Sequence, residues 1–423
     1  DLCKLSGQEK RKHLNALHQL AEQGYRVLAV AHAINVPNDL PETQFGFHYQ
    51  FLGFLGLEDP VRPEVRHAIK ESLTAGVRVI MITGDYSVTA KSIGKQIGLP
   101  KDGKIMTGEE LAKLSDAELK EKIEGVSIFA RVKPEQKLRI VRALQQNNEI
   151  VAMTGDGVND APALKAANIG IAMGNKGTDV AREASSLVLL DDNFASIVAA
   201  IRSGRRIFDN LQKAMSYIIA IHIPIIGLSL IPAFIPSIPT ILMPLHIVFM
   251  ELIIDPVCSV AFESETEEKN IMRRPPRETN KNFFGTRKMM FSILQGLILL
   301  SMVLTIYFIS IAEGHSQGEV RAITFSALII GNIFLILNNL SKTRSFLSVF
   351  IYTNKAALFI LFLAISLLML TITVPSFREL FGFEHPGYAH FKTSLIAALI
   401  MLGILEVIKY LRIFSRNKMP KLS

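Results

Sequence analysis

The sequence is poor in cysteine and in charged side chains. Its 423 residues include only two cysteines, Cys3 and Cys258, which are far apart and suggest neither a disulfide framework nor a zinc site. Charged residues make up 20% of the chain, below the roughly 25% typical of soluble domains. The opening segment, residues 1–20, is charged and amphipathic and does not resemble a signal peptide. The hydrophobic share of 49% therefore directs attention to long apolar segments.

Positive charge exceeds negative charge, since the formal net charge is +8. A basic balance can indicate nucleic-acid binding. Here, however, the cations lie mostly in short loops between apolar segments, which is the pattern of a membrane protein. We therefore expect a lipid bilayer as a partner and no nucleic acid.

Long apolar segments dominate the chain from about residue 213 onward, whereas the preceding part has the composition of an ordinary globular protein. A helix that crosses a bilayer needs about 20 mostly apolar residues. Six segments meet this requirement: about 214–236, 243–262, 289–312, 320–340, 356–375 and 392–412. Six buried helices of a soluble protein are the alternative, but six such segments in succession favour a membrane domain. We predict a multi-pass integral membrane protein with an all-α, six-helix transmembrane domain over residues 201–423.

The loops between these segments differ in lysine and arginine content. The cation-rich ones are residues 263–288, 341–345 and 412–423, and the cation-poor ones are 312–320 and 376–390. Because cytoplasmic loops carry the excess of lysine and arginine, residues 1–213 and the C-terminus are predicted to be cytoplasmic.

Ionisable side chains interrupt the second apolar segment. Glu251 and Asp255 lie one helical turn apart and therefore share a helix face, and Pro256 follows directly. Ionisable groups inside a bilayer are costly and usually functional. These carboxylates, with backbone carbonyls freed by the proline, predict a cation site. His222 precedes Pro224 in the first segment, while Asn332 and Glu406 in later segments are also expected to form hydrogen bonds between helices.

The first half alternates strand-like apolar runs with helical patterns, which indicates a parallel, doubly wound sheet. The runs are residues 77–83, 149–154, 168–173 and 185–190. Thr83-Gly84-Asp85 and Thr154-Gly155-Asp156 stand at the ends of two of them. Because ligands bind at the carboxyl ends of such strands, we expect both sequences to line one crevice.

The chemistry of these strand ends suits phosphate and magnesium. Glycine admits the close approach of an anion to backbone amides, and carboxylates bind Mg²⁺. Lys133 and Lys137 follow a further strand-like run, and one of them could neutralise a phosphoryl group. Neither a dinucleotide-binding fingerprint nor a P-loop motif occurs in the sequence.

Five segments resemble, in order, motifs of the P-type cation-transporting ATPases, specifically their calcium-pump-like branch. They are LEDPVRPEV, MITGD, FARVKPEQK, TGDGVNDAPALK and IAMGNKGTDVAREAS. The six apolar segments are similar to the last six membrane helices of that family. The resemblance implies an α/β haloacid-dehalogenase-like (Rossmann-like) phosphorylation domain over residues 41–200, and a C-terminal remnant of the nucleotide-binding domain over residues 1–40.

The same resemblance implies a role for each site residue. ATP and Mg²⁺ are the implied cofactors, and the activity is cation transport driven by ATP hydrolysis. Thr83, Gly84 and Asp85 would lie beside the γ-phosphate, and Lys137 would face the phosphoryl group. Asp156 would bind Mg²⁺ with support from Asn159 and Asp160. Arg26 matches an arginine that contacts ATP.

Part of the family pattern is missing from the sequence. The aspartate that accepts phosphate lies in a D-K-T-G-T motif, which does not occur in these 423 residues. We therefore expect a C-terminal fragment, inactive alone, that lacks the N-terminal part of the same pump. A non-catalytic subunit of a split pump is one alternative. A membrane-tethered phosphatase of the same fold is another, but it would need a D-x-D motif, and none is present.

The ion site also departs from the two-site calcium pump. Glu251 and Asp255 match ion-coordinating positions, whereas His222, Ile225, Ile254 and Asn332 replace other ligands. The predicted ligands of the transported ion are therefore Glu251, Asp255, His222 and Asn332. The hypothesis is that the parent pump moves one cation per ATP across the plasma membrane. Oxygen ligands favour Ca²⁺ and leave Mn²⁺ as the alternative. His222 would titrate, tune metal preference or bond a neighbouring helix.

Overall fold

The computed structural model describes residues 2–34, 36, 40–235, 238–278, 282–341 and 354–417. The chain forms two compact units. The first comprises residues 1–202 with 272–279, and the second comprises residues 203–271 with 280–423. The cation-rich segments 341–345 and 412–423 lie largely outside the described residues.

The first unit begins with a helix and a two-stranded antiparallel sheet. Helix α1 (Gly7–Glu22) starts at a capping box, in which Ser6 and Glu9 satisfy each other's backbone amides. Strands β1 (Arg26–Ile34) and β2 (His48–Leu57) pair along their whole length, and the 3₁₀ turn η1 (Gln44–Gly46) precedes β2. Leucines on both strands, such as Leu28 and Leu52, are exposed. The hairpin therefore buries little apolar surface of its own.

Six parallel strands form the centre of the first unit, in two sheets. One sheet has the order β3 (Met81–Ile82), β5 (Val126–Ala130), β4 (Lys104–Thr107), and the other has the order β6 (Ala152–Gly155), β7 (Ile169–Met173), β8 (Leu187–Leu189). The parallel arrangement agrees with the sequence, but the expectation of one continuous sheet is wrong for the described residues. The reason is that β3 and β6 are edge strands and are not hydrogen-bonded to each other.

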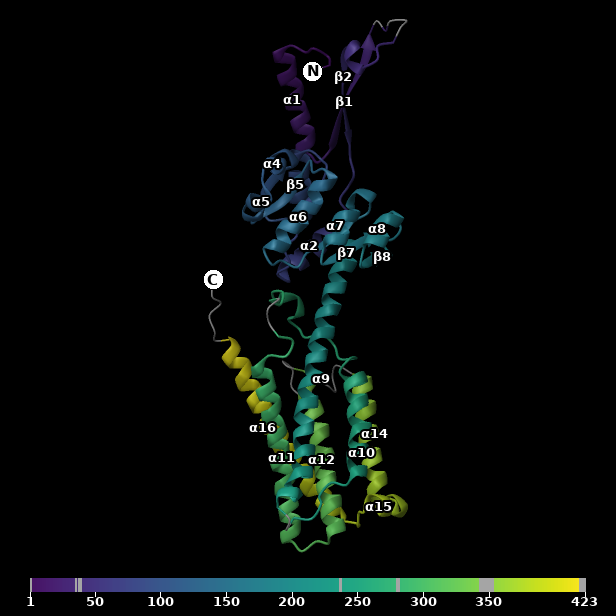
Figure 1. Ribbon diagram of the computed structural model, residues 1–423, viewed down its shortest axis with the longest axis vertical. Helices are drawn as coiled ribbons and strands as arrows, with labels where there is room; N and C mark the ends of the chain where they lie inside the picture. Colours follow the sequence, from purple (N-terminus) through teal and green to yellow (C-terminus); the bar gives the residue numbers. More distant parts are fainter. Residues whose placement is uncertain are drawn as a thin grey trace. The chain divides into compact units, whose positions relative to one another are not determined.

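Helices surround these strands, as the βα alternation of the sequence predicts (Figure 1). They are α2 (Pro63–Thr74), α3 (Ser87–Ile97), α4 (Gly108–Ala112), α5 (Asp116–Lys122), α6 (Pro134–Gln146), η2 (Val158–Asp160), α7 (Ala161–Ala166) and α8 (Asp179–Ala184). Proline in the first turn helps to start α2 and α6 because that position needs no backbone donor. Ile82 packs against the apolar clusters on both sheets. The two sheets therefore share a continuous core.

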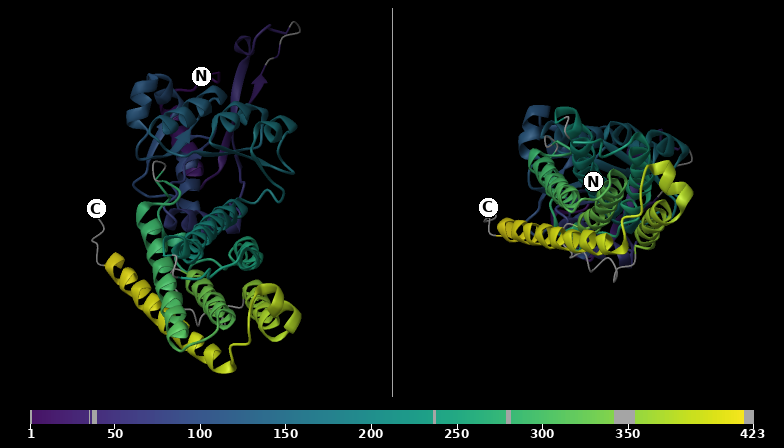
Figure 2. Two further views of the ribbon diagram at one scale, coloured as in Figure 1. Left: turned by 60° about the horizontal axis from the view of Figure 1, so that its bottom comes forward. Right: turned by 90° about the horizontal axis from the view of Figure 1, so that it is seen from below.

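The second unit consists of helices, several of them long and apolar (Figures 1 and 2). Helix α16 packs along α11 and α12. Its elements are α9 (Phe194–Phe234), whose first residues up to Arg202 belong to the first unit, α10 (Pro244–Pro256), the π-helical turn η3 (Val257–Ala261), α11 (Thr286–Ala312), α12 (Gln317–Asn339), α14 (Lys355–Thr373), α15 (Pro375–Phe381) and α16 (Tyr388–Asn417). The 3₁₀ turn η4 (Ile271–Arg273) lies at the boundary between the units, with Met272 and Arg273 in the first.

Five helices among the described residues are long and apolar enough to cross a bilayer, rather than the six predicted. The exception is α10, which has only 13 residues before the backbone changes to a π-helical turn at Val257. Pro256 stands at that change, and it lacks the amide that would continue the α-helical hydrogen bonds. The predicted break beside Glu251 and Asp255 is therefore present, and it shortens the second segment.

The first membrane segment also differs from its prediction, because α9 starts at Phe194 rather than near residue 214. The Asn193 side chain accepts a hydrogen bond from the Ala195 amide (2.9 Å) and so caps the helix. Ser196 and the backbone of Asn193 donate to the nearby Asp191 carboxylate and hold its pKa below the usual range. Hydropathy alone cannot detect this polar first part of the helix.

Buried polar contacts join the loop after α10 to three helices. The Lys213 ammonium of α9 lies 3.1 Å from the Glu268 carboxylate, with both side chains almost fully buried. Ser341, just after α12, donates to Glu268 (3.2 Å). Asn354, at the start of α14, donates to Glu265 (2.9 Å). The loop is thus a packed part of the second unit.

Candidate functional site

The first Thr-Gly-Asp sequence forms a turn directly after β3. The Thr83 hydroxyl donates to the Asp85 carboxylate (2.8 Å), and the Asp85 amide donates back to the Thr83 hydroxyl (3.1 Å). The Thr83 amide bonds the Phe129 carbonyl (2.9 Å), and the Val132 amide bonds the Thr83 carbonyl (3.1 Å). The turn is therefore held against the end of the neighbouring strand β5.

The second Thr-Gly-Asp sequence ends β6 and leads into a buried ion pair. Lys137, in the second turn of α6, lies 2.6 Å from Asp160, and both side chains are mostly buried. The Gly157 amide also donates to Asp160 (3.3 Å). A side chain at position 155 would clash, since its Cβ would lie 2.5 Å from the Asp160 Cβ. Glycine is therefore needed here so that Asp160 can reach Lys137.

Asp156 and Asn159 stand at the same strand end and are exposed. Within the described part of the chain, the Asp156 carboxylate has no hydrogen bond or ion pair, so its oxygens are available to a ligand. Its backbone carbonyl accepts from the Thr178 amide (2.8 Å). An exposed carboxylate on an anchored backbone has the chemistry of a Mg²⁺ ligand. The assigned role of Asp156 stays a prediction.

The prediction that the two Thr-Gly-Asp sequences line one crevice receives partial support from the structure. Both lie at the carboxyl ends of edge strands, and Lys137 belongs to the helix that follows β5, against which the first turn is held. No hydrogen bond or ion pair among the described residues joins Thr83 or Asp85 to Lys137 or Asp160. Arg26 is exposed at the start of β1 and forms no such contact with these groups either.

The loop at residues 174–177 is held by residues that were not among the predicted site residues. Asp192 is buried, and its two oxygens accept from the amides of Asn175 and Lys176, both at 3.0 Å. Arg182 donates to the carbonyls of Gly174 and Gly177. This loop precedes Thr178, whose amide bonds Asp156. Asn175, Lys176 and Arg182 lie within the motif IAMGNKGTDVAREAS. The motif indicates that this segment matters, but it does not indicate which of its residues contact Asp192 or the loop carbonyls.

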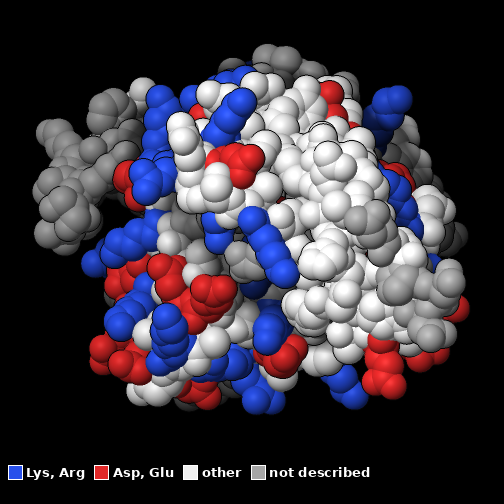
Figure 3. All heavy atoms as spheres, turned by 90° about the horizontal axis from the view of Figure 1, so that it is seen from above, with Lys and Arg blue, Asp and Glu red and all other residues white. Residues whose placement is uncertain are grey.

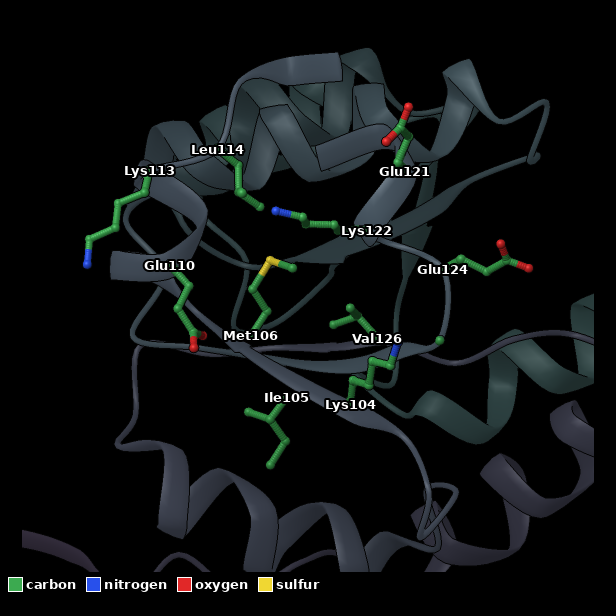
Figure 4. A pocket seen from close by; sticks show the side chains of 11 residues that line it. Lys104, Ile105, Met106, Glu110, Lys113, Leu114, Glu121, Lys122, Glu124 and Val126 are labelled. Carbon is green, nitrogen blue, oxygen red and sulfur yellow. The ribbon is translucent and has the colours of Figure 1, made fainter. Parts of the chain in front are cut away.

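A pocket of about 870 Å³ lies apart from the strand-end residues. Figure 4 shows that it lies beside β4, α4 and α5, and it is lined by Lys104, Ile105, Met106, Glu110, Lys113, Leu114, Glu121, Lys122, Glu124, Gly125 and Val126. None of these residues belongs to the predicted site. On the face seen in Figure 3, acidic and basic side chains are interspersed beside a broad uncharged area.

In the second unit, the structure brings together two of the predicted ion ligands. His222 Nε2 lies 3.6 Å from a Glu251 oxygen, and the other ring nitrogen lies 2.8 Å from the Ile218 carbonyl one turn earlier in α9. Asp255 is exposed on α10. The apolar replacements Ile225 and Ile254 are buried. Their side chains provide no oxygen to a cation.

Asn332, the remaining predicted ligand, is only 1% exposed on α12. Neither its amide nitrogen nor its oxygen has a hydrogen-bond partner among the described residues. Leaving a buried amide unpaired costs about 1–3 kcal/mol, so such a group calls for a physical explanation. A bound ion or water would supply one, but in the described part of the chain no hydrogen bond joins Asn332 to His222 or Glu251.

Comparisons with known proteins identify both halves of the chain. Residues 8–168 match a family of haloacid dehalogenase-like hydrolases, and residues 239–411 match the family described as cation transporting ATPase, C-terminus. Bacillus subtilis has a relative named calcium-transporting ATPase, which is 41% identical over 81% of this chain and 38% of the relative. A Saccharomyces cerevisiae calcium-transporting ATPase 1 is 34% identical over 98% of this chain and 44% of the relative.

A third relative, from Mycobacterium bovis, is named probable cation-transporting ATPase F and is 34% identical over 81% of this chain. The chain spans less than half the length of these relatives. Their similarity runs through both the parallel-sheet unit and the membrane helices. The chain therefore belongs to the P-type cation-transporting ATPases, in the branch that contains the calcium-transporting members.

Proposed function

We propose that this chain supplies the Mg²⁺- and phosphate-binding half of a phosphorylation site, together with part of an ion path, to an ATP-driven Ca²⁺ pump. The observation that carries the proposal is the arrangement at the end of β6. There Lys137 is paired with the buried Asp160 at 2.6 Å, and the exposed Asp156 carboxylate has no protein partner among the described residues. The lysine is thus held at the strand end that also carries an exposed carboxylate, and a cation beside a carboxylate suits a metal–phosphate group.

Thr83 and Asp85 would contact the γ-phosphate in this scheme, with Gly84 leaving room for it. A Cβ at position 84 would have no atom within 4 Å, so the first turn faces open space. Asn159 would support Mg²⁺ beside Asp156, and Arg26 would contact ATP at the start of β1. ATP and Mg²⁺ are accordingly the proposed cofactors.

The phosphate-accepting aspartate would come from sequence outside these 423 residues. Two observations support the idea that this aspartate lies at the end of a β-strand that pairs with β3 and β6. Among the described residues, strands β3 and β6 each have one edge without a paired strand, and a Thr-Gly-Asp sequence stands at the carboxyl end of both. In addition, Ile150 and Ala152, which belong to an apolar run typical of a buried parallel strand, are exposed. A strand paired with these edges would cover them and bring its carboxyl end to the same site.

The ion path would pass His222, Glu251, Asp255 and Asn332. The orphaned amide of Asn332 and the helical break at Pro256 support this assignment, since backbone carbonyls near such a break can join an ion site. We propose α10 with its π-helical turn as the sixth span. Residues 1–213 and the C-terminus would be cytoplasmic, and the membrane would be the plasma membrane.

Because Ile225 and Ile254 are apolar and buried, they remove ligands from one of the family's two sites. The proposed stoichiometry is therefore one cation per ATP. Transport of two ions per ATP by the complete pump would refute it.

Two substitutions in the complete pump test the assignments independently. Asp156→Ala should abolish Mg²⁺-dependent phosphorylation by ATP while ion binding persists. Asp255→Ala should abolish ion-stimulated turnover while nucleotide binding persists. Asp102→Ala removes an exposed carboxylate of the same unit just before the amino end of β4, rather than at a carboxyl end, and should leave both activities intact. Normal phosphorylation of the Asp156→Ala pump would remove that residue from the site, and normal transport by Asp255→Ala would remove Asp255 from the ion path.

A further inference from the structure

A second group of metal-ligating side chains lies in the helical unit, at the end where α11 finishes and α12 begins. It consists of Glu313, His315 and His390, and one potential ligand atom from each lies within 4.8 Å of the other two. Glu313 is exposed, whereas both histidines are half-buried. None of these residues belongs to the proposed ion path.

The fold brings these residues together from two segments, the turn after α11 and the start of α16. Helix α11 ends at Ala312, and Glu313 is its C-cap. Gly314 then adopts a left-handed backbone conformation (φ +81°), which turns the chain so that the His315 amide bonds the Ser310 carbonyl (3.3 Å). His390 comes from the first turn of α16. The turn thus places His315 between the end of one helix and the start of another.

The distances around His315 suit metal binding. Its Nε2 lies 3.4 Å from a Glu313 oxygen. Two ligand atoms at about 2.0–2.1 Å from a tetrahedral metal are separated by about 3.3 Å. The His390 ring stands at 90° to the His315 ring, with 4.4 Å between the ring centres. The three ligand atoms lie within 4.8 Å of one another. A small movement of the His390 side chain toward His315 would bring its nitrogen to the separation of about 3.3 Å expected for a tetrahedral site.

A further carboxylate orients the central ligand. His315 Nδ1 lies 3.1 Å from Glu319, on the first turn of α12. A ring N–H that donates to a carboxylate fixes the tautomer and leaves the other nitrogen free to bind a metal. Glu384 adds negative charge nearby, since it accepts a hydrogen bond from Ser316. Three carboxylates beside two imidazoles therefore favour a cation here.

We propose that Glu313, His315 and His390 form a binding site for a borderline transition-metal cation, Zn²⁺ or Cu²⁺. Two imidazole nitrogens and one carboxylate oxygen suit these metals, whereas Ca²⁺ and Mg²⁺ require oxygen ligands. The site is therefore chemically distinct from the proposed Ca²⁺ path. A bound metal would tie together the end of α11, the start of α12 and the start of α16.

Titration of Zn²⁺ into the tag-free, metal-stripped full chain in detergent, followed by calorimetry, tests the site. His315→Ala and His390→Ala should each remove one equivalent of binding, and Glu319→Gln should weaken that equivalent by roughly 10- to 100-fold. His385→Ala removes a histidine that lies near this end of the unit but outside the triad, and it should bind like the wild type. His222→Ala separates any Zn²⁺ binding in the ion path from binding at this site.

Electron paramagnetic resonance of the wild-type chain with one equivalent of Cu²⁺ provides a test that does not depend on the folding of a variant. The spectrum should show coupling to two imidazole nitrogens. Full Zn²⁺ binding by both alanine variants, or a Cu²⁺ spectrum without two-nitrogen coupling, would overturn the proposal and leave His315 as a helix-capping partner of Glu319.

Discussion

At the scale of single residues, the two Thr-Gly-Asp sequences look alike but occupy different surroundings. Gly84 faces open space, whereas Gly155 lies against Asp160, whose Cβ would be 2.5 Å from an added Cβ. The repeated tripeptide thus has two physical functions. In the first copy, glycine leaves room near the strand end, and in the second it permits the approach of Asp160 to Lys137.

Gly155→Ala should therefore destabilise the chain, by about 1–3 kcal/mol, because an added methyl group forces the packed neighbour to move. Gly84→Ala is the matched control and should change stability by less than about 0.5 kcal/mol, as substitutions away from packed features do. Thermal unfolding followed by circular dichroism measures both. Equal losses for the two variants would contradict the packing role of Gly155.

At the scale of elements, α9 and α11 approach each other closely at one glycine. A Cβ at Gly296 of α11 would lie 2.5 Å from the Ala220 carbonyl oxygen and 2.7 Å from the Ile223 Cβ, both on α9. Pro224 removes the amide that would otherwise bond this carbonyl. Small residues allow membrane helices to pack closely, so this glycine sets the separation of the two helices.

Gly296→Ala should lower the thermal midpoint in detergent, even though alanine favours helix by about 1 kcal/mol relative to glycine. The obstructing atoms belong to the backbone and to a branched side chain, and neither can move aside easily. Gly403 of α16 is the matched control, since an added Cβ there meets nothing within 4 Å. Gly403→Ala should leave the midpoint unchanged or raise it. A higher thermal midpoint for both variants would show that α9 and α11 are not closely packed at Gly296.

At the scale of the whole molecule, the chain combines a parallel-sheet unit that has unpaired strand edges with a helical unit held together by buried polar contacts. Lys213 and Glu268 are 1% and 3% exposed, so they are almost completely removed from solvent. Removing one member of such a pair leaves an uncompensated buried charge, whereas removing both does not. The pair therefore specifies how the loop after α10 packs on the helices.

Lys213→Met should destabilise the helical unit by about 3–5 kcal/mol, the range for breaking a buried pair. Combining it with Glu268→Gln should recover much of the loss, because the remaining partner no longer carries a charge. Thermal unfolding of the single and double variants in the same detergent gives the comparison. If the double variant is less stable than Lys213→Met, charge pairing is not the source of the effect.

The sequence predicted features that depend on local pattern. Alternating apolar and helical runs were sufficient for the parallel strands, and Pro256 was sufficient for the break in α10. Two boundaries were missed because they depend on contacts rather than composition. Helix α9 begins at Phe194, where Asn193 caps a polar stretch that hydropathy does not detect. The expected single sheet is divided because β3 and β6 are not paired with each other.

By itself, the sequence determined the family and the membrane character, since these follow from motifs and from the length of apolar segments, and it predicted which residues would carry phosphate and metal chemistry. Only the tertiary structure decided which of those residues meet. It joined Lys137 to Asp160 and His222 to Glu251, and it left the exposed Asp156 carboxylate and the buried Asn332 amide without a hydrogen-bond partner among the residues that the structure describes. It also brought His390 beside Glu313 and His315, because packing of α11, α12 and α16 joins a turn near residue 314 to a segment about 75 residues later.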